Sequence, residues 1–261
     1  MAFLLSDHHF GEKLIIENGQ TRIARSPYKI ALPLSYTPDL AYLTGYHLGD
    51  GYLYSHKSNR TKPSYEILYS DEYKRQIDSV IAPIFRKYFG VELHIHKRQN
   101  NVWIGRINCK VLHMFFNQVL RLPAGRKGNF SIPAWIFSEE KYIKEFISGF
   151  FDAEGSIFIS KPERVSITLT NSNYWILHKI RDLLWTRFEI AFGKIYKKHK
   201  INVFEMKTSA KEVILRFCGE IEFRHPHKIE KMKEGLALLE QKHARPSKVA
   251  RPPAFLNEAF Y

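Results

Sequence analysis

Two acidic residues, Asp50 and Glu154, close two similar stretches of this chain. The first stretch reads LTGYHLGDG over Leu43–Gly51 and returns as ISGFFDAEG over Ile147–Gly155. In each, a helix-like run ends in a small residue, one carboxylate and a glycine. An acid at the carboxyl end of a helix meets the negative end of the helix dipole, so its charge is unfavourable until a cation binds. Carboxylate and main-chain oxygens are the ligands that Mg²⁺ prefers.

The repetition favours chemistry over an ordinary turn. A single GDG after a helix is most often a turn with a capping acid. Here both copies follow a predicted helix and precede two predicted strands. Paired carboxylates that hold metal ions are the arrangement used for metal-assisted hydrolysis of phosphodiesters.

Small residues four positions apart predict how the two helices meet. Gly45 and Gly49 have this spacing in the first helix, and Gly149 and Ala153 have it in the second. Such a stripe lets two helix backbones approach closely. Because glycine inside a helix costs about 0.5–1 kcal/mol relative to alanine, the stripes need a packing reason. We therefore expect the two helices to pack against each other and to bring the two acids together.

The elements that must position these acids follow one order twice, α-β-β-α-β-β-α. In the first copy Thr37 caps the motif helix and Pro38 begins it. Two strands, at about 51–56 and 65–70, precede a helix over 71–89 that Pro83 should kink. A hairpin that turns near Asn100-Asn101 and a helix over 110–120 complete it.

The second copy restarts after a segment rich in Pro, Gly and basic residues. Ser138 is the predicted cap of its motif helix, and an amphipathic helix near 228–242 follows the copy. This order predicts an α+β fold with an internal duplication. The predicted divisions are a leader with an Asn18-Gly19 hairpin (1–36), the first half (37–120), a linker (121–137), the second half (138–220) and a C-terminal helix with a basic tail (221–261).

Charge and cysteine content limit the function classes. Lys and Arg number 40 against 26 acids, which gives a net charge of +14. Such a surplus favours a polyanionic partner, because neutralised phosphates release counterions. A membrane partner is not expected, since no apolar run approaches the length of a span. Only two cysteines, Cys109 and Cys218, are present. They predict buried thiols in an intracellular, reducing compartment, such as an archaeal cytoplasm or an organelle.

Both motif segments resemble the LAGLIDADG signature of homing endonucleases. The first matches at Leu43, Gly45, Gly49, Asp50 and Gly51; the second matches at Gly149, Asp152, Ala153, Glu154 and Gly155. The element order and the two copies in one chain also match that family from about 37 to 220. The phrase FRHPHK at 223–228 is similar to a segment common in archaeal and organellar members.

The resemblance implies a monomer with a pseudo-two-fold axis, whose antiparallel sheets form a saddle on double-stranded DNA with the helices packed behind. It implies that Asp50 and Glu154 are the essential metal-binding acids, with the carbonyls of Gly49 and Ala153 as further ligands. The metal would be Mg²⁺, for which Mn²⁺ should substitute. Each acid would serve the cleavage of one strand.

One position departs from the family pattern. The family often has a polar or basic residue near the end of the second strand of each half, where this chain has Asp71 and Asn171. Asn171 can fill the role, whereas Asp71 fits less well and could simply cap the next helix. The family also often uses a basic residue from the second hairpin. Lys197 is our candidate, with Lys198, His96 and Lys97 as alternatives, and phosphate contact or solvent exposure is an equally good reading of each.

Strand alternation predicts which side chains face DNA. In VELHIHKRQ, Leu93 and Ile95 should face the helices. Polar and aromatic side chains on the other face could read bases in the major groove, while Lys and Arg position the backbone. The residues predicted to contact DNA are Tyr52, Tyr54, His56, His94, His96, Arg98, Lys194, Lys198 and Lys200.

Three functions remain open from the sequence. The first is a site-specific endonuclease that makes a metal-dependent double-strand break at a long target and promotes intron homing. The second is an RNA maturase that binds its host intron, and the third is a non-catalytic DNA-binding regulator. The retention of both acids favours cleavage, since binding alone does not require them. The chain lacks a splicing nucleophile at its start, so we expect an intron-encoded protein and not an intein.

Overall fold

The computed structural model describes residues 14–17, 20–23, 30–56, 63–160, 164–199 and 201–241. The chain divides into two compact units. The first comprises Met1–Ala153 with Phe223–His227, and the second comprises Glu154–Glu222 with Lys228–Tyr261. The domain divisions expected from the sequence, with a linker at 121–137, stay a prediction, and the first compact unit ends at Ala153 of the second motif helix. This helix belongs to the first unit because it packs on the first motif helix.

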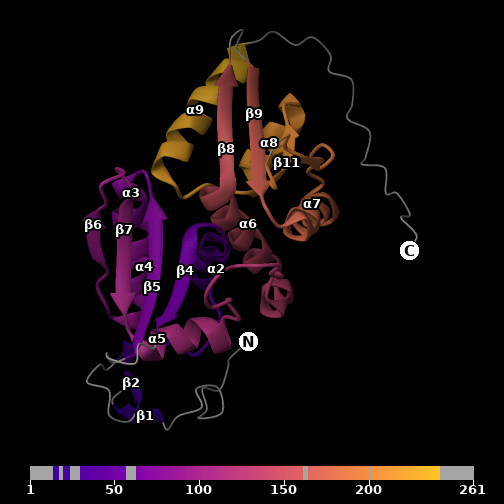
Figure 1. The fold of residues 1–261 in the computed structure, drawn as a ribbon. Helices are drawn as coiled ribbons and strands as arrows, with labels where there is room; N and C mark the ends of the chain where they lie inside the picture. The colour runs from indigo at the N-terminus through magenta and orange to yellow at the C-terminus, as the bar shows by residue number, and fades with distance from the viewer. Residues whose placement is uncertain are drawn as a thin grey trace. The chain divides into compact units, whose positions relative to one another are not determined.

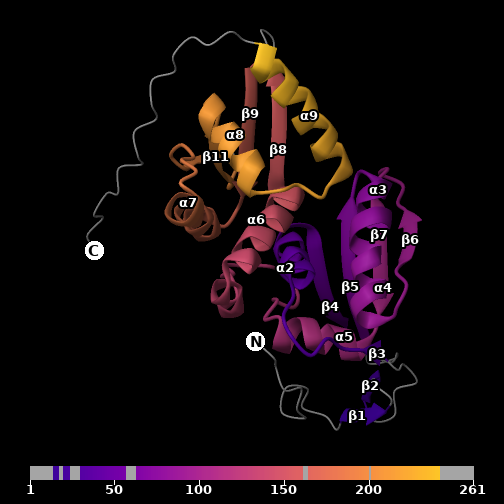
Figure 2. The same ribbon diagram turned by 180° about the vertical axis from the view of Figure 1, so that it is seen from behind.

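The first unit is built on a four-stranded antiparallel sheet in the order β4-β5-β7-β6. Helix α4 lies across one face of this sheet (Figure 2). A smaller sheet, β1-β2-β3, precedes it. The elements are β1 (Leu14–Glu17), β2 (Gln20–Ile23), β3 (Ile30–Ala31), α2 (Pro38–Asp50), β4 (Gly51–His56), β5 (Ser64–Asp71), α3 (Lys74–Gln76), π-helix η1 (Ile77–Ile81), α4 (Ala82–Phe89), β6 (His94–Lys97), β7 (Trp103–Asn108), α5 (Lys110–Met114), π-helix η2 (Phe115–Val119), 3₁₀ helix η3 (Ala134–Ser138) and α6 (Glu140–Glu154).

The second unit repeats the four-stranded sheet in the order β10-β11-β9-β8. Figure 1 shows β8, β9 and β11 of this sheet. Helix α7 contacts β9 and β11, and α9 packs through Gly235 on Val165 and Ile159. Its elements are β8 (Gly155–Ser160), β9 (Arg164–Asn171), α7 (Tyr174–Phe188), β10 (Tyr196–Lys197), β11 (Phe204–Thr208), α8 (Lys211–Glu220) and α9 (Pro226–Gln241). The duplicated α+β order predicted from the sequence is therefore confirmed.

Local signals behave as expected in several places. Thr37 accepts a hydrogen bond from the Leu40 amide and caps α2. Strands β1 and β2 pair antiparallel on either side of Asn18-Gly19, which itself lies outside the described residues. Pro83 lacks an N–H, and the turn before it widens into η1, where the Ala82 amide reaches back five residues to Ile77. The predicted irregularity is thus a π-helical turn.

Two helix starts were predicted wrongly. The helix expected from Asp71 begins at Lys74, because Asp71 ends β5 and accepts the Tyr73 amide at 2.7 Å in a local turn. Ser138 does not cap α6. Its hydroxyl donates to the Trp135 carbonyl at 2.8 Å and closes η3 instead. In both cases a short polar side chain uses its hydrogen bond in the preceding turn.

The two cysteines are free thiols, with Cys109 buried and Cys218 half-buried. Burial raises the pKa of the Cys218 thiol to about 11 and also raises that of Cys109. Both therefore stay protonated and act as small apolar side chains. No helix in the described part of the chain is long and apolar enough to cross a membrane.

Candidate metal centre and nucleic-acid interface

The two motif helices pack at their glycines. A Cβ at Gly45 would lie 2.1 Å from the Phe146 carbonyl oxygen of α6, and one at Gly149 would lie 2.0 Å from the Tyr42 carbonyl oxygen of α2. Only glycine allows backbones to come this close. The packing predicted from the small-residue spacing is therefore confirmed for α2 and α6. That Asp50 and Glu154 meet stays a prediction.

Asp50 is the last residue of α2, and the side chain of Lys127 contacts the same end of this helix. Lys127 donates to the carbonyls of His47 at 2.8 Å and Leu48 at 3.0 Å, and also to the carbonyl of Gly49. A lysine ammonium at this place balances the negative end of the helix dipole. The Gly49 carbonyl, which the resemblance implies as a metal ligand, thus already accepts a hydrogen bond from Lys127.

Lys127 was not among the site residues predicted from the sequence, although it contacts the end of α2 next to Asp50. It lies in the segment interpreted as a linker, and this segment is tied to the first sheet by the Gly125 amide, which donates to the Leu53 carbonyl at 2.8 Å. The available signal was a single lysine between two glycines, Gly125 and Gly128. That pattern carries no information about which helix end the lysine reaches.

Glu154 ends α6 and is held by Asn171. The Asn171 side-chain amide donates to Glu154 Oε1 at 2.9 Å, while its carbonyl oxygen accepts the Asn173 amide at 2.8 Å. Asn171 is 7 % exposed, so its orientation is fixed by these two bonds. Ala153 precedes Glu154 on the same helix.

Asp71 occupies the corresponding position of the first unit but makes different contacts. Its Oδ2 accepts the Tyr46 hydroxyl at 2.7 Å and lies 3.2 Å from His225 Nε2. Burial would raise the pKa of Asp71, but the hydrogen bond and charge of His225, with the Tyr73 amide and Tyr46, lower it. Burial, Asp71 and Asp50 raise the pKa of Tyr46, which therefore stays a donor. Asp71 is therefore an ionised carboxylate that accepts hydrogen bonds from Tyr46 and His225. It does not contact a motif acid in the way that the Asn171 amide contacts Glu154.

One face of the first sheet carries the side chains predicted for DNA. Leu53 is fully buried, while Tyr54 on the other side of β4 is 38 % exposed and stacks with Tyr52. His94 lies opposite Arg106 in the β6–β7 register. The His94 and His96 rings stack with centroids 5.2 Å apart, and burial, Arg106 and His94 lower the pKa of His96. Arg98 is exposed in the following turn, and the His56 side chain lies outside the described part.

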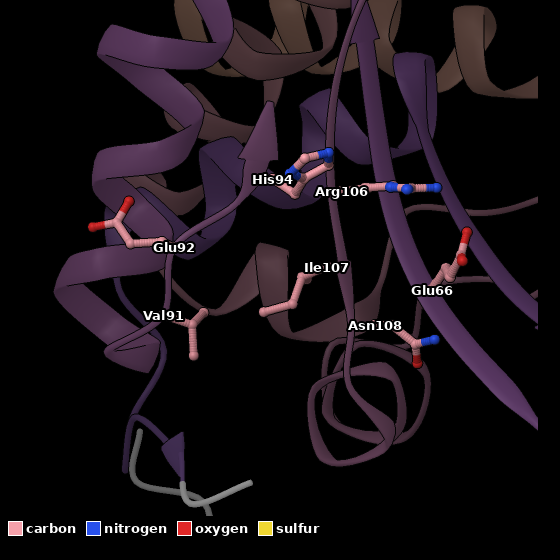
Figure 3. Close-up of a pocket in the computed structure, with 7 residues that line it drawn as sticks. All are labelled: Glu66, Val91, Glu92, His94, Arg106, Ile107 and Asn108. Atoms are coloured by element: carbon pink, nitrogen blue, oxygen red, sulfur yellow. The ribbon is translucent and has the colours of Figure 1, made fainter. Parts of the chain in front are cut away.

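A hollow of about 620 Å³ opens on the first sheet beside these residues. Figure 3 shows the side chains of His94 and Arg106 close together on neighbouring strands, with Glu66 and Asn108 at the far side. Arg106 was not among the predicted DNA contacts. Arg106 lies opposite His94 because β6 and β7 pair in this register. The alternation of residues within one strand does not predict which residue of the neighbouring strand lies opposite. An arginine beside two imidazoles offers donors to phosphates or to guanine.

The second sheet has a similar open face. Ile157 is buried, and Phe158, the fourth residue of β8, is 58 % exposed. Lys194 and Lys197 are exposed, and Lys200 lies outside the described residues. Lys197 of β10 pairs with Phe204 of β11, and Phe204 pairs in turn with Asn171 of β9, so Lys197 and Asn171 are separated by one strand. Lys198 forms an ion pair with Glu205 at 2.8 Å. The DNA contacts of these residues and the catalytic role of Lys197 stay predictions.

The donor chemistry around the acids suits a hard cation. Each motif supplies one carboxylate and helix-terminal carbonyls, which are oxygen ligands. Among the described residues, no group of three His, Cys, Asp or Glu side chains forms a ready-made metal cluster.

Comparisons with known proteins agree with this description. Residues 141–222 match the model of the LAGLIDADG-like domain. The chain is similar to the crystal structure of I-DmoI in complex with DNA and Ca, at 19 % identity and a TM-score of 0.56 over 74 % of this chain and 96 % of that one. It is also similar to the structure of LAGLIDADG meganuclease I-AabMI bound to uncleaved DNA, at 14 % identity and a TM-score of 0.51 over 78 % of this chain and 92 % of that one.

A curated relative is a glutamine–fructose-6-phosphate aminotransferase (isomerizing) from Methanocaldococcus jannaschii, 28 % identical over 208 residues. The match covers 78 % of this chain but 18 % of that protein. The chain therefore spans under a fifth of the relative's length, and the relative's name describes the whole of it.

Two packed motif helices, each ending in an acid beside an antiparallel sheet, define a duplicated α+β protein built to present a polar sheet face and a carboxylate from each repeat. Residues 141–222 match the LAGLIDADG-like domain model, and the chain shares the fold of the solved LAGLIDADG and homing endonuclease structures to which it is similar.

Proposed function

We propose that this protein is a site-specific DNA endonuclease that makes a divalent-metal-dependent double-strand break in a long target. The observation that carries the proposal is the packing of α2 on α6 through Gly45 and Gly149, with one acid at the end of each helix. The net charge of +14 supports a polyanionic substrate. We further propose that the metal is Mg²⁺, that Mn²⁺ substitutes for it, and that cleavage promotes homing of a host intron.

The chain's own residues would position the reaction. Asp50 and Glu154 would hold the cation, and Asn171 would keep the Glu154 carboxylate in one orientation. Lys127 would counter the negative charge at the end of α2. A divalent ion held there supplies charge neutralisation for the phosphate and for the leaving oxygen. The open faces of the two sheets would bind the DNA backbone and read base edges.

The test is cleavage of the uninterrupted allele, in which the insertion junction should be the site. Purified full-length chain is incubated with this duplex in Mg²⁺, in Mn²⁺ and in EDTA. We expect a double-strand break at one position in either metal and none in EDTA. Binding of the duplex without cleavage in both metals would favour a regulator and would refute the proposal.

Replacing Lys127 with Met is expected to slow cleavage about tenfold, because it removes a positive charge worth on the order of 1 kcal/mol from the end of α2 next to Asp50. Because Lys127 also balances the dipole of α2, the free energy of unfolding should fall by about 1 kcal/mol. Single-turnover cleavage and thermal unfolding measure the two effects. Arg126→Met removes a charge from the same segment at an exposed position and should leave the rate unchanged.

Tyr54 and Phe158 occupy the same position, the fourth residue, in β4 and β8. Exposed aromatic rings on a groove-facing sheet suit the methyl group of thymine. Phe158→Ala should therefore weaken the preference for thymine over uracil at one target position, about tenfold, with little loss of stability because the ring is largely exposed. Competition binding between thymine and uracil duplexes measures it, and Ser156→Ala on the same strand is the control. An unchanged preference would contradict this role.

A further inference from the structure

The segment Phe223–His227, here named the strap, lies in the first unit although the chain before and after it belongs to the second. It joins α8 to α9. Its contacts reach α2, α6 and the end of β5. A five-residue connection can link two helices without any of these contacts. The contacts with α2, α6 and β5 therefore indicate a further role for the strap.

Arg224 fixes the strap to the beginnings and sides of the two motif helices. Its guanidinium pairs with Asp39 of α2 at 2.7 Å and with Glu145 of α6 at 2.6 Å. It also lies over the Tyr42 ring, 4.5 Å from the centroid. Such paired charge contacts are strong when they are partly buried. Arg224 therefore anchors the strap away from the acids.

His225 reaches the opposite part of both helices. Its backbone amide donates to Asp152 Oδ2 at 2.9 Å, beside the Arg224 amide at 2.8 Å and the Tyr42 hydroxyl at 2.7 Å. Asp152 precedes Glu154 by two residues on α6. The strap is thus bonded to the last turn of the second motif helix.

The ring of His225 makes the other connection. Nε2 lies 3.2 Å from Asp71 Oδ2, which also accepts the Tyr46 hydroxyl at 2.7 Å. Because a carboxylate only accepts, Nε2 is the donor. Tyr46 stands one helical turn before Asp50 on α2. His225 and Asp71 are both almost fully buried, so neither group is replaced by water without cost.

We propose that His225 is a positioning residue for the reaction: it joins the last turns of α2 and α6, through Asp71–Tyr46 and through Asp152, and so holds the two metal-binding acids in the geometry that cleavage requires. This rests on the proposed endonuclease function. It also explains the aspartate at position 71, whose charge serves the strap and not the metal. Arg224 and His225 of the tail phrase FRHPHK are therefore part of the framework that positions the two acids.

The test separates the ring contact from the backbone contact. His225→Asn keeps the backbone hydrogen bond to Asp152 but removes the side-chain donor at the Nε2 position that faces Asp71. His225→Gln supplies a side-chain N–H donor at about that position. The matched control is His227→Asn, which removes another imidazole of the strap, one whose ring stacks on the Tyr73 ring with the centroids 4.1 Å apart. Single-turnover cleavage of the uninterrupted allele is measured at several Mg²⁺ concentrations, with DNA affinity in Ca²⁺ and thermal unfolding.

We expect His225→Asn to cut about tenfold more slowly and to need more Mg²⁺ for half its maximal rate, with DNA affinity unchanged within about twofold. His225→Gln should recover most of the rate, and His227→Asn should match the unaltered protein. In an Asp71→Asn background, His225→Asn should cause no further loss, because the two side chains act through one contact.

Equal rates for His225→Asn and the unaltered protein would overturn the proposal, as would the same tenfold loss in the Asp71→Asn background. If His225→Asn does not fold, Tyr46→Phe carries the test, since it removes only the hydroxyl at the other end of the connection. It should slow cleavage and raise the Mg²⁺ requirement similarly, and a normal rate would refute the proposal. Absence of cleavage by the unaltered protein would instead refute the endonuclease function.

Discussion

Asp50→Asn and Glu154→Gln are each expected to abolish double-strand cleavage, by on the order of 10³-fold or more, because each removes a charged ligand of the cation. The two variants should still bind the target duplex in Ca²⁺. Asp50→Asn should be at least as stable as the unaltered protein, since it removes a negative charge from the carboxyl end of α2. Plasmid cleavage that separates supercoiled, nicked and linear products measures the effect.

The control for these variants is Asp78→Asn, which alters a surface acid that pairs with Lys74 within the helical turn. It should cut normally. Nicked product from a single variant would show that the remaining acid still serves one strand. Full cutting by the double variant Asp50→Asn, Glu154→Gln would contradict the assignment of both acids.

Gly149→Ala is expected to destabilise the protein by about 3 kcal/mol or more, the upper range for overpacking. The added methyl group would lie 2.0 Å from the Tyr42 carbonyl oxygen and 2.9 Å from the Tyr46 amide nitrogen. Both atoms are backbone, so α2 and α6 must separate. A shift of the unfolding midpoint by about 10 °C is the expected reading.

The matched control is Gly219→Ala, a glycine in α8 where an added Cβ meets no atom within 4 Å. Here alanine should stabilise the helix by about 0.5–1 kcal/mol. The same chemical change would thus have opposite signs at the two sites. Equal small effects at Gly149 and Gly219 would show that the helices are not in backbone contact.

Much of the local architecture was predictable. The Thr37 cap, the strand pairs and the turn near Asn100-Asn101 depend on neighbours in sequence, and all are present. The starts of α3 and α6 were not, because Asp71 and Ser138 each use a hydrogen bond in the preceding turn. Competition between a helix cap and a turn is decided by differences that the residue types alone do not contain.

Some residues of the candidate site were predictable from the sequence and others were not. Asp50 and Glu154 were predicted from the repeated motif and its spacing, and Asn171 was predicted from the family resemblance; Asn171 does contact Glu154. Lys127 and His225 were not identified as site residues. Each reaches a helix end more than seventy positions away, and no periodic pattern marks such a contact.

The sequence by itself determined that this protein has two copies of one unit, two helices able to touch at glycine, and one acid at the end of each. These follow from periodicity and from the size of single residues, which are local properties. Only the tertiary structure decided that Asp71 contacts His225 while Asn171 contacts Glu154, the acid predicted to bind metal. The same backbone turn presents both side chains, and the difference arises because the strap places His225 against one of them and not the other.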